Sequence, residues 1–181
     1  MVVEVDVTTG MLEVMTAIRN LLIVLTAFLY VVQAKADDIK DIKEVIKIYN
    51  HTVIQASKSK NLPDIITFKN MMSDIAVGRV AEKLYIWIMS WHESNLYMDA
   101  KLLDIKFTNI SVNGDTATAF TDEKWTYRYI DISRGVVAHP ETEVRYKMRY
   151  DLVKNNDRWL IRKIKIISQD EKILKNKEGK R

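Results

Sequence analysis

The chain has 181 residues, of which 48% are hydrophobic and 29% charged, and its formal net charge is +4. This length and composition are typical of one folded domain with a buried core, and they exclude a disordered chain and a polytopic membrane protein. The sequence has no cysteine, which excludes disulfides, iron–sulfur clusters and thiolate zinc sites. The three histidines, His51, His92 and His139, share no metal-binding spacing, and no glycine-rich phosphate-binding motif is present, so we expect no metal and no cofactor.

An uncharged hydrophobic run occupies residues 21–32 and is followed by the small residues Ala34 and Ala36. A membrane-spanning helix needs about 20 apolar residues, whereas the hydrophobic part of a secretory signal needs about 7–15. We predict that residues 1–36 are a signal peptide; the alternative is an uncleaved single-pass anchor formed by residues 11–33. Both alternatives export the remaining domain: a cleaved signal predicts a periplasmic or secreted protein, and an anchor predicts a membrane-bound domain outside the cytoplasm.

Three helices are predicted after this segment. Apolar residues recur at helical spacing over residues 37–58. Pro63 predicts the first turn of a second, short helix, and Ser73-Asp74 predicts the cap of a third helix that ends near Asn95. The buried line of the third helix is expected to contain Ile75, Val80, Leu84, Trp87, Ile88 and Trp91.

Beyond residue 100 the hydrophobic period changes to two, which is typical of β-strands. A first strand near residues 103–107 leads to Asn113-Gly114, a dipeptide that favours the centre of a type I′ hairpin turn. A long second strand covers residues 115–131, a loop covers residues 133–142, and two further strands are joined by a turn at residues 155–157.

We predict an α+β domain over residues 37–168, in which three helices pack on a curved, cone-like, four-stranded antiparallel sheet. Residues 169–181 are expected to form a charged tail that carries much of the excess positive charge, so we expect no nucleic-acid partner. Arg145, Lys147 and Arg149 alternate outward on the third strand, where a solvated face, an acidic or anionic partner and a homodimer are the alternatives.

The order of these elements resembles the nuclear-transport-factor-2-like superfamily, also called cystatin-like or SnoaL-like. The residues that carry the resemblance are 123–129 (EKWTYRY) on the long bent strand and 159–161 (WLI) in the final hairpin. Residues 144–146 (VRY) and 150–154 (YDLVK) are similar to the closing hairpin of the C-terminal domain of chloroplast-division proteins and their cyanobacterial relatives. The resemblance implies a cone whose wide end opens into a ligand pocket.

Glu123 is the candidate catalytic residue. Superfamily enzymes of the ketosteroid-isomerase and dehydratase type place a carboxylate or histidine inside an apolar cone as general acid or base. Strand alternation places Glu123 on one face with Trp125 and Tyr127, and neighbouring tyrosines could donate to an oxyanion. The competing interpretation is that Glu123 reaches water or pairs with a basic residue, so the sequence leaves enzymatic activity open.

Aromatic residues are the candidate ligand-binding set, although each ring can equally belong to an ordinary core. The set consists of Trp87, Trp91, Trp125, Tyr127, Tyr146 and Tyr150. We predict an exported, non-catalytic domain that binds a protein partner or an apolar small molecule. The alternatives are a small lyase or isomerase that uses Glu123, and a membrane-tethered component of a secretion or envelope assembly.

Overall fold

The computed structural model describes the backbone of residues 7–174 and the side chains of residues 16, 18–26 and 36–174. The first residues of the expected signal segment, the side chain of Ala34 and residues 175–181 of the expected tail lie outside the described part. Two units are distinguished, Met1–Asp38 and Ile39–Arg181, and each is considered by itself.

Helix α1, Val7–Lys58, is a single α-helix that begins in the first unit and ends in the second. In the first unit, the side chains of Ile18 and of residues 21–25 are exposed. Within the described part of the chain, no helix is long and apolar enough to cross a membrane.

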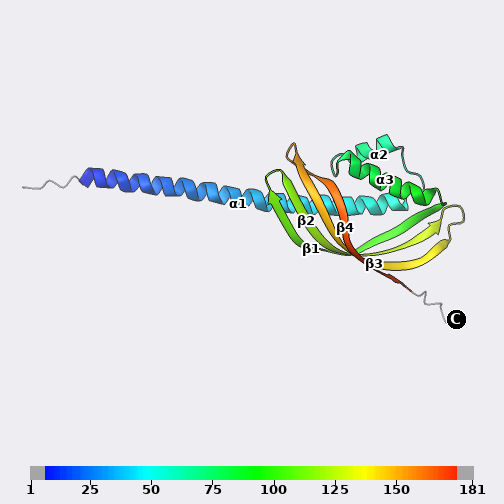
Figure 1. The fold of residues 1–181 in the computed structure, drawn as a ribbon. Helices are drawn as coiled ribbons and strands as arrows, with labels where there is room; N and C mark the ends of the chain where they lie inside the picture. Colours follow the sequence, from blue (N-terminus) through cyan, green and yellow to red (C-terminus); the bar gives the residue numbers. More distant parts are fainter. Residues whose placement is uncertain (1–6, 175–181) are drawn as a thin grey trace, which may run out of the picture. The chain divides into compact units, whose positions relative to one another are not determined.

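The second unit contains the α+β domain (Figure 1). Residues 39–58 of α1 lie along one face of the sheet, where the line from Ile42 through Ile46 to Val53 is buried at the predicted helical spacing. Helices α2, Ile65–Met71, and α3, Gly78–His92, follow α1 in the chain. The three predicted helices of the domain are therefore present.

The predicted starts of the second and third helices are wrong. Helix α2 is capped by Asp64, whose Oδ1 accepts hydrogen bonds from the backbone N–H groups of Ile66 and Thr67, so Pro63 precedes the cap. Helix α3 begins after Val77 because the preceding residues pair with the sheet: Val77 N–H donates to the Ile161 carbonyl at 3.0 Å. This pairing prevents Ser73-Asp74 from capping the helix.

The sheet is an antiparallel meander of four strands in the order β1-β2-β3-β4. The strands are β1, Leu96–Asn113; β2, Thr116–Asp131; β3, Val137–Asn155; and β4, Arg158–Ile173. Register shifts interrupt all three pairings, and the strands bend around residues 39–58 of α1 in Figure 1. The curved sheet that the sequence predicts is thus formed.

The first hairpin turn and the predicted loop differ from their predictions, whereas the turn predicted at residues 155–157 is formed. The first hairpin turns through Gly114-Asp115, with a φ of +54° at Gly114, so Asn113 is the last strand residue instead of a turn centre. Asn156 and Asp157 both have positive φ, as a type I′ turn requires. The predicted 133–142 loop is too long because β3 begins at Val137, and β4 continues past residue 168 to Ile173.

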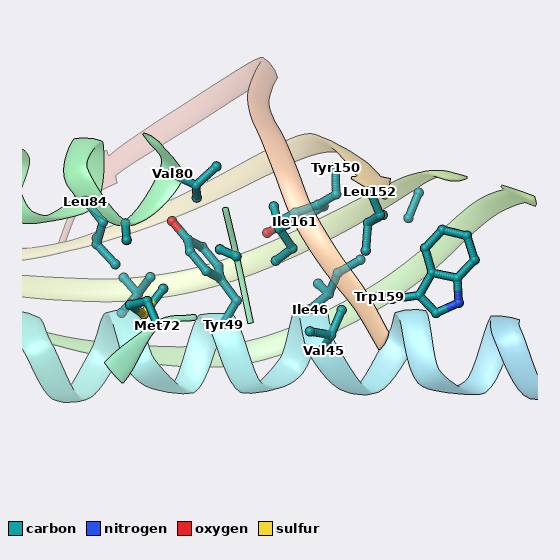
Figure 2. Close-up of a cluster of buried hydrophobic side chains, with 14 of the residues drawn as sticks. Val45, Ile46, Tyr49, Met72, Val80, Leu84, Tyr150, Leu152, Trp159 and Ile161 are labelled. Carbon is teal, nitrogen blue, oxygen red and sulfur yellow. The ribbon is translucent and has the colours of Figure 1, made fainter. Parts of the chain in front are cut away.

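The core fills the space between α1, α2, α3 and the sheet. Figure 2 shows Trp159 and Leu152 over one end of the helix segment, Leu84 over the other, and Tyr49 and Tyr150 between them. Buried members of this cluster come from all three helices and from β2, β3 and β4. Burial of these side chains is the main source of the domain's stability.

Candidate functional site

A cavity of about 1110 Å³ opens between residues 39–58 of α1, helix α3 and the sheet. All four strands contribute to its wall, from Ala100 on β1 to Ile166 on β4. A volume of this size accommodates a drug-sized ligand. The wide opening that the cone implies is therefore present in the second unit.

Aromatic side chains form much of the cavity wall. The rings that line it are Trp87 from α3, Trp125, Tyr127 and Tyr129 from β2, Tyr146 and Tyr150 from β3, and Tyr49 from α1. Trp87 is 45% exposed although the helical period predicts it to be buried, because Leu84 and Ile88 take the core-facing positions of α3. An exposed indole at the edge of a cavity offers apolar contact area to a ligand.

Trp91 is the predicted ligand residue that the structure places outside the cavity wall; the other five line the cavity. Its ring packs behind Trp87, with a centroid distance of 4.1 Å, and against Tyr129 at 5.6 Å. Trp91 therefore supports the aromatic wall from behind.

Glu123 lies in the wall of the cavity and is only 3% exposed. Its Oε1 accepts hydrogen bonds from the Thr121 hydroxyl and the Tyr150 phenol, both at 2.7 Å, and its Oε2 accepts one from Trp125 Nε1 at 2.9 Å. Among the described residues, no lysine or arginine forms an ion pair with it. Hydrogen bonds to neutral donors thus hold this buried carboxylate, and the predicted alternatives of open solvent or a basic partner are wrong.

The tyrosines around Glu123 resist ionisation. Burial raises the pKa of Tyr150 well above its ordinary value, and the negative charge of Glu123 and the hydrogen bond to it raise it further. Burial and Glu123 also raise the pKa of Tyr49, and burial with neighbouring tyrosines and carboxylates raises the pKa of Tyr146 to about 12. These phenols are therefore neutral hydrogen-bond donors at physiological pH.

Asn50 is a polar residue of the cavity that the sequence reasoning missed. It is 3% exposed, lines the cavity and sits beside Tyr150, whose phenol oxygen is 3.4 Å from Asn50 Oδ1. Its Nδ2 is buried and has no hydrogen-bond partner within the described part of the chain. The signal was present, because Asn50 follows Ile46 by four positions and precedes Val53 by three on the apolar face of α1.

Charged side chains also line the cavity. The basic ones are Arg79 and Lys83 on α3 and Arg162 and Lys163 on β4, and all four residues are exposed. Glu171 lies close enough to Tyr127, Tyr129 and Tyr146 to raise the pKa of each. The predicted outward residues Arg145, Lys147 and Arg149 are exposed, and Arg149 pairs with Asp151 at 2.8 Å.

Comparison with known proteins finds a similar fold but does not assign the chain to a family. Neither a protein-family profile nor a curated protein sequence matches the chain. A solved structure does match: the crystal structure of the intermembrane space region of the chloroplast protein ARC6, with a TM-score of 0.58 and 14% sequence identity. The match covers 71% of this chain and 95% of that chain. The domain thus has an α+β fold similar to that of the ARC6 region.

Proposed function

We propose that the domain binds an apolar small molecule in the cavity and does not catalyse a reaction on it. The observation that carries this proposal is the cavity itself, with its volume of about 1110 Å³ and its predominantly aromatic and aliphatic wall. Ligand pockets of this kind combine an apolar lining with a few placed polar groups. The volume is close to the range of about 300–1,000 Å³ that is typical of small-molecule sites, which favours a small molecule over a protein segment.

The surroundings of Glu123 favour binding over catalysis. A lyase or isomerase would need the carboxylate to exchange protons with a substrate. Thr121, Trp125 and Tyr150 already occupy three of its roughly four acceptor positions. The carboxylate is therefore held mainly by its own chain, and lyase or isomerase chemistry is the weaker proposal.

Titration of the full chain with the neutral fluorophore N-phenyl-1-naphthylamine tests the proposal. We expect saturable fluorescence enhancement with one site per chain. Trp87→Ala removes an exposed ring of the wall and is expected to weaken binding about tenfold, which is the size of a lost aromatic contact. Ile86→Ala is the matched control, because Ile86 neighbours Trp87 on α3, is 58% exposed and does not line the cavity.

Absence of saturable binding would contradict the proposal, as would equal effects of the two substitutions. Equal effects would mean that the dye binds general apolar surface of α3.

The domain's superfamily is a second part of the proposal. We infer that it is a nuclear-transport-factor-2-like domain. The inference is supported by three helices followed by a four-stranded antiparallel meander that bends around residues 39–58 of α1. The fold similarity to the ARC6 region agrees with the resemblance of the closing hairpin to chloroplast-division proteins.

Export of the domain is a third part. The hydrophobic run at residues 21–32 supports it, and the region of ARC6 with a similar fold is described as an intermembrane space region. N-terminal sequencing of the chain after expression in a bacterium, combined with cell fractionation, tests it. A periplasmic product that begins at Asp37 is expected for a cleaved signal, and an intact membrane-bound product for a tethered component. An intact product in the cytosol would contradict export.

A further inference from the structure

The cavity contains a polar floor formed by Asn50, Glu123 and Tyr150. The Tyr150 phenol oxygen joins the other two, at 2.7 Å from Glu123 Oε1 and 3.4 Å from Asn50 Oδ1. All three side chains line the cavity, and each residue is at most 3% exposed. The polar floor lies among apolar cavity residues, including Val53 and Val144. The three residues therefore form one buried polar cluster of the cavity lining.

Asn50 leaves one amide atom of the polar floor without a strong partner. Tyr150 has a single hydroxyl proton, and its shorter hydrogen bond directs that proton to Glu123. Nδ2 of Asn50 is buried, and none of the residues that the structure describes accepts a hydrogen bond from it. If the amide is turned over, Nδ2 can donate to the Tyr150 oxygen, but Oδ1 then takes the unpaired position. A buried polar atom without a partner costs about 1–3 kcal/mol, so its retention in a cavity wall points to a ligand group.

Glu123 leaves one acceptor position of the polar floor open. A carboxylate has about four lone-pair positions, and Thr121, Trp125 and Tyr150 fill three of them. The charge-assisted hydrogen bond that an added donor would form there is stronger than one between neutral groups. The polar floor therefore offers an acceptor at Glu123 and an unpaired amide atom at Asn50.

We propose that the cavity selects an apolar ligand that carries a neutral hydroxyl group, which binds to Glu123 and Asn50 on the polar floor. This inference rests on the proposed function. A hydroxyl has one proton to donate to Glu123 and lone pairs that accept from Asn50 Nδ2, so one group serves both residues. A hydrocarbon of the same shape leaves both positions of the polar floor unfilled, and a carboxylate has no proton to donate to the open acceptor position of Glu123.

Calorimetric titration of the full chain with naphthalene, 2-naphthol and 2-naphthoate tests the inference, because the three probes share a ring system and differ in one substituent. We expect 2-naphthol to bind about tenfold more tightly than naphthalene, the size of one added hydrogen bond at a buried site. We expect 2-naphthoate to bind more weakly than 2-naphthol. Equal affinities for 2-naphthol and naphthalene would overturn the inference. Tightest binding of 2-naphthoate would also overturn it, because the ligand would then be held by basic residues such as Arg79 and Lys83.

Asn50→Leu separates the role in binding from a purely structural role. The substitution removes the amide while keeping a side chain of similar size, and it is expected to reduce the preference for 2-naphthol over naphthalene, because the hydrogen bond to Glu123 remains. Gln55→Leu is the matched control, because it replaces an exposed amide of α1 that does not line the cavity. If Asn50→Leu changed the stability of the domain but left the preference for 2-naphthol over naphthalene unchanged, the inference would be contradicted. The proposed function itself would be contradicted if the wild-type chain bound none of the three naphthalene probes and no N-phenyl-1-naphthylamine.

Discussion

The two ends of the domain are built differently. At the closed end, Ile46, Leu152 and Ile161 are fully buried and Trp159 is 3% exposed. At the open end, Trp87, Tyr127 and Tyr146 keep part of their surface in contact with the cavity. The closed end follows the packing of an ordinary core, whereas the open end keeps large side chains around unfilled space.

The sequence of β2 explains much of this difference. At the closed end β2 contributes the small residues Ala117 and Ala119 to the same buried cluster as Ile42 and Ile46 of α1. At the open end β2 contributes the large rings of Trp125 and Tyr127, which line the cavity. The closed end therefore supplies stability, and the open end is the part available for binding.

The largest expected effect on the free energy of unfolding comes from replacing the tryptophan at the closed end, compared with the same replacement at the open end. Trp159→Ala is expected to lower the free energy of unfolding by about 3–5 kcal/mol, because it removes a buried ring and leaves a cavity. Trp87→Ala is expected to cost less than about 1 kcal/mol, since the ring is 45% exposed. Urea denaturation followed by circular dichroism measures both values, and similar losses for the two variants would remove the distinction between the ends.

The next largest effect is expected from the hydrogen bond that the Tyr150 phenol donates to Glu123. Tyr150→Phe removes one of the donors to Glu123 and is expected to cost about 1.5–3 kcal/mol, because the carboxylate stays buried with fewer hydrogen bonds. Tyr146→Phe, which removes a half-buried phenol of the same cavity wall, is the control, with an expected change within about 0.5 kcal/mol. If both variants unfold at the same urea concentration, the hydrogen bond to Glu123 contributes nothing measurable.

Alkaline pH is expected to destabilise the domain through the same residues. The folded state raises the pKa of Tyr49 and Tyr150, so unfolded chains lose these protons first. Their contribution to stability is complete below the unfolded pKa of about 10 and is lost as the pH rises above it, at about 1.4 kcal/mol per pH unit for each tyrosine. Tyr49→Phe should reduce the slope of unfolding free energy against pH between about 10 and 11, and an unchanged slope would contradict the burial of this phenol.

The smallest effect is expected where charges hold the end of α1 to the sheet. Asp99 on β1 pairs with Lys58 at 3.1 Å and with Arg128 at 3.0 Å. These pairs are partly exposed, so Asp99→Asn is expected to lower the free energy of unfolding by about 0.2–1 kcal/mol, and the difference should shrink in high salt. A loss as large as that of Trp159→Ala would mean that the open end is held as strongly as the closed end.

The sequence predicted the sheet and the face of β2 well, because both depend on local patterns. Alternation along β2 places Ala119, Thr121, Glu123 and Trp125 on one face, and all four are buried. The Asn155 turn was predicted from turn-forming residues and is formed. The helical period also predicted the buried line of α1.

Features that depend on contacts between distant segments were not predicted. The start of α3 depends on pairing between Val77 and Ile161, which local sequence does not reveal. The helical period predicts that both Trp87 and Ile88 of α3 are buried, but only Ile88 faces the core. Asn50 was missed because the pattern of α1 was interpreted from its apolar residues alone.

The four tryptophans allow the most direct test of the central claim, which is that the open end takes up an apolar ligand while the closed end stays packed. Each tryptophan gives one indole N–H resonance in a ¹H–¹⁵N correlation spectrum, and single Trp→Phe variants assign these resonances. On titration with 2-naphthol, we expect the resonances of Trp87 and Trp125 to shift with one common affinity while that of Trp159 stays in place. A shift of Trp159 as large as those of Trp87 and Trp125, or no shift of any of them at saturating 2-naphthol, would contradict the account.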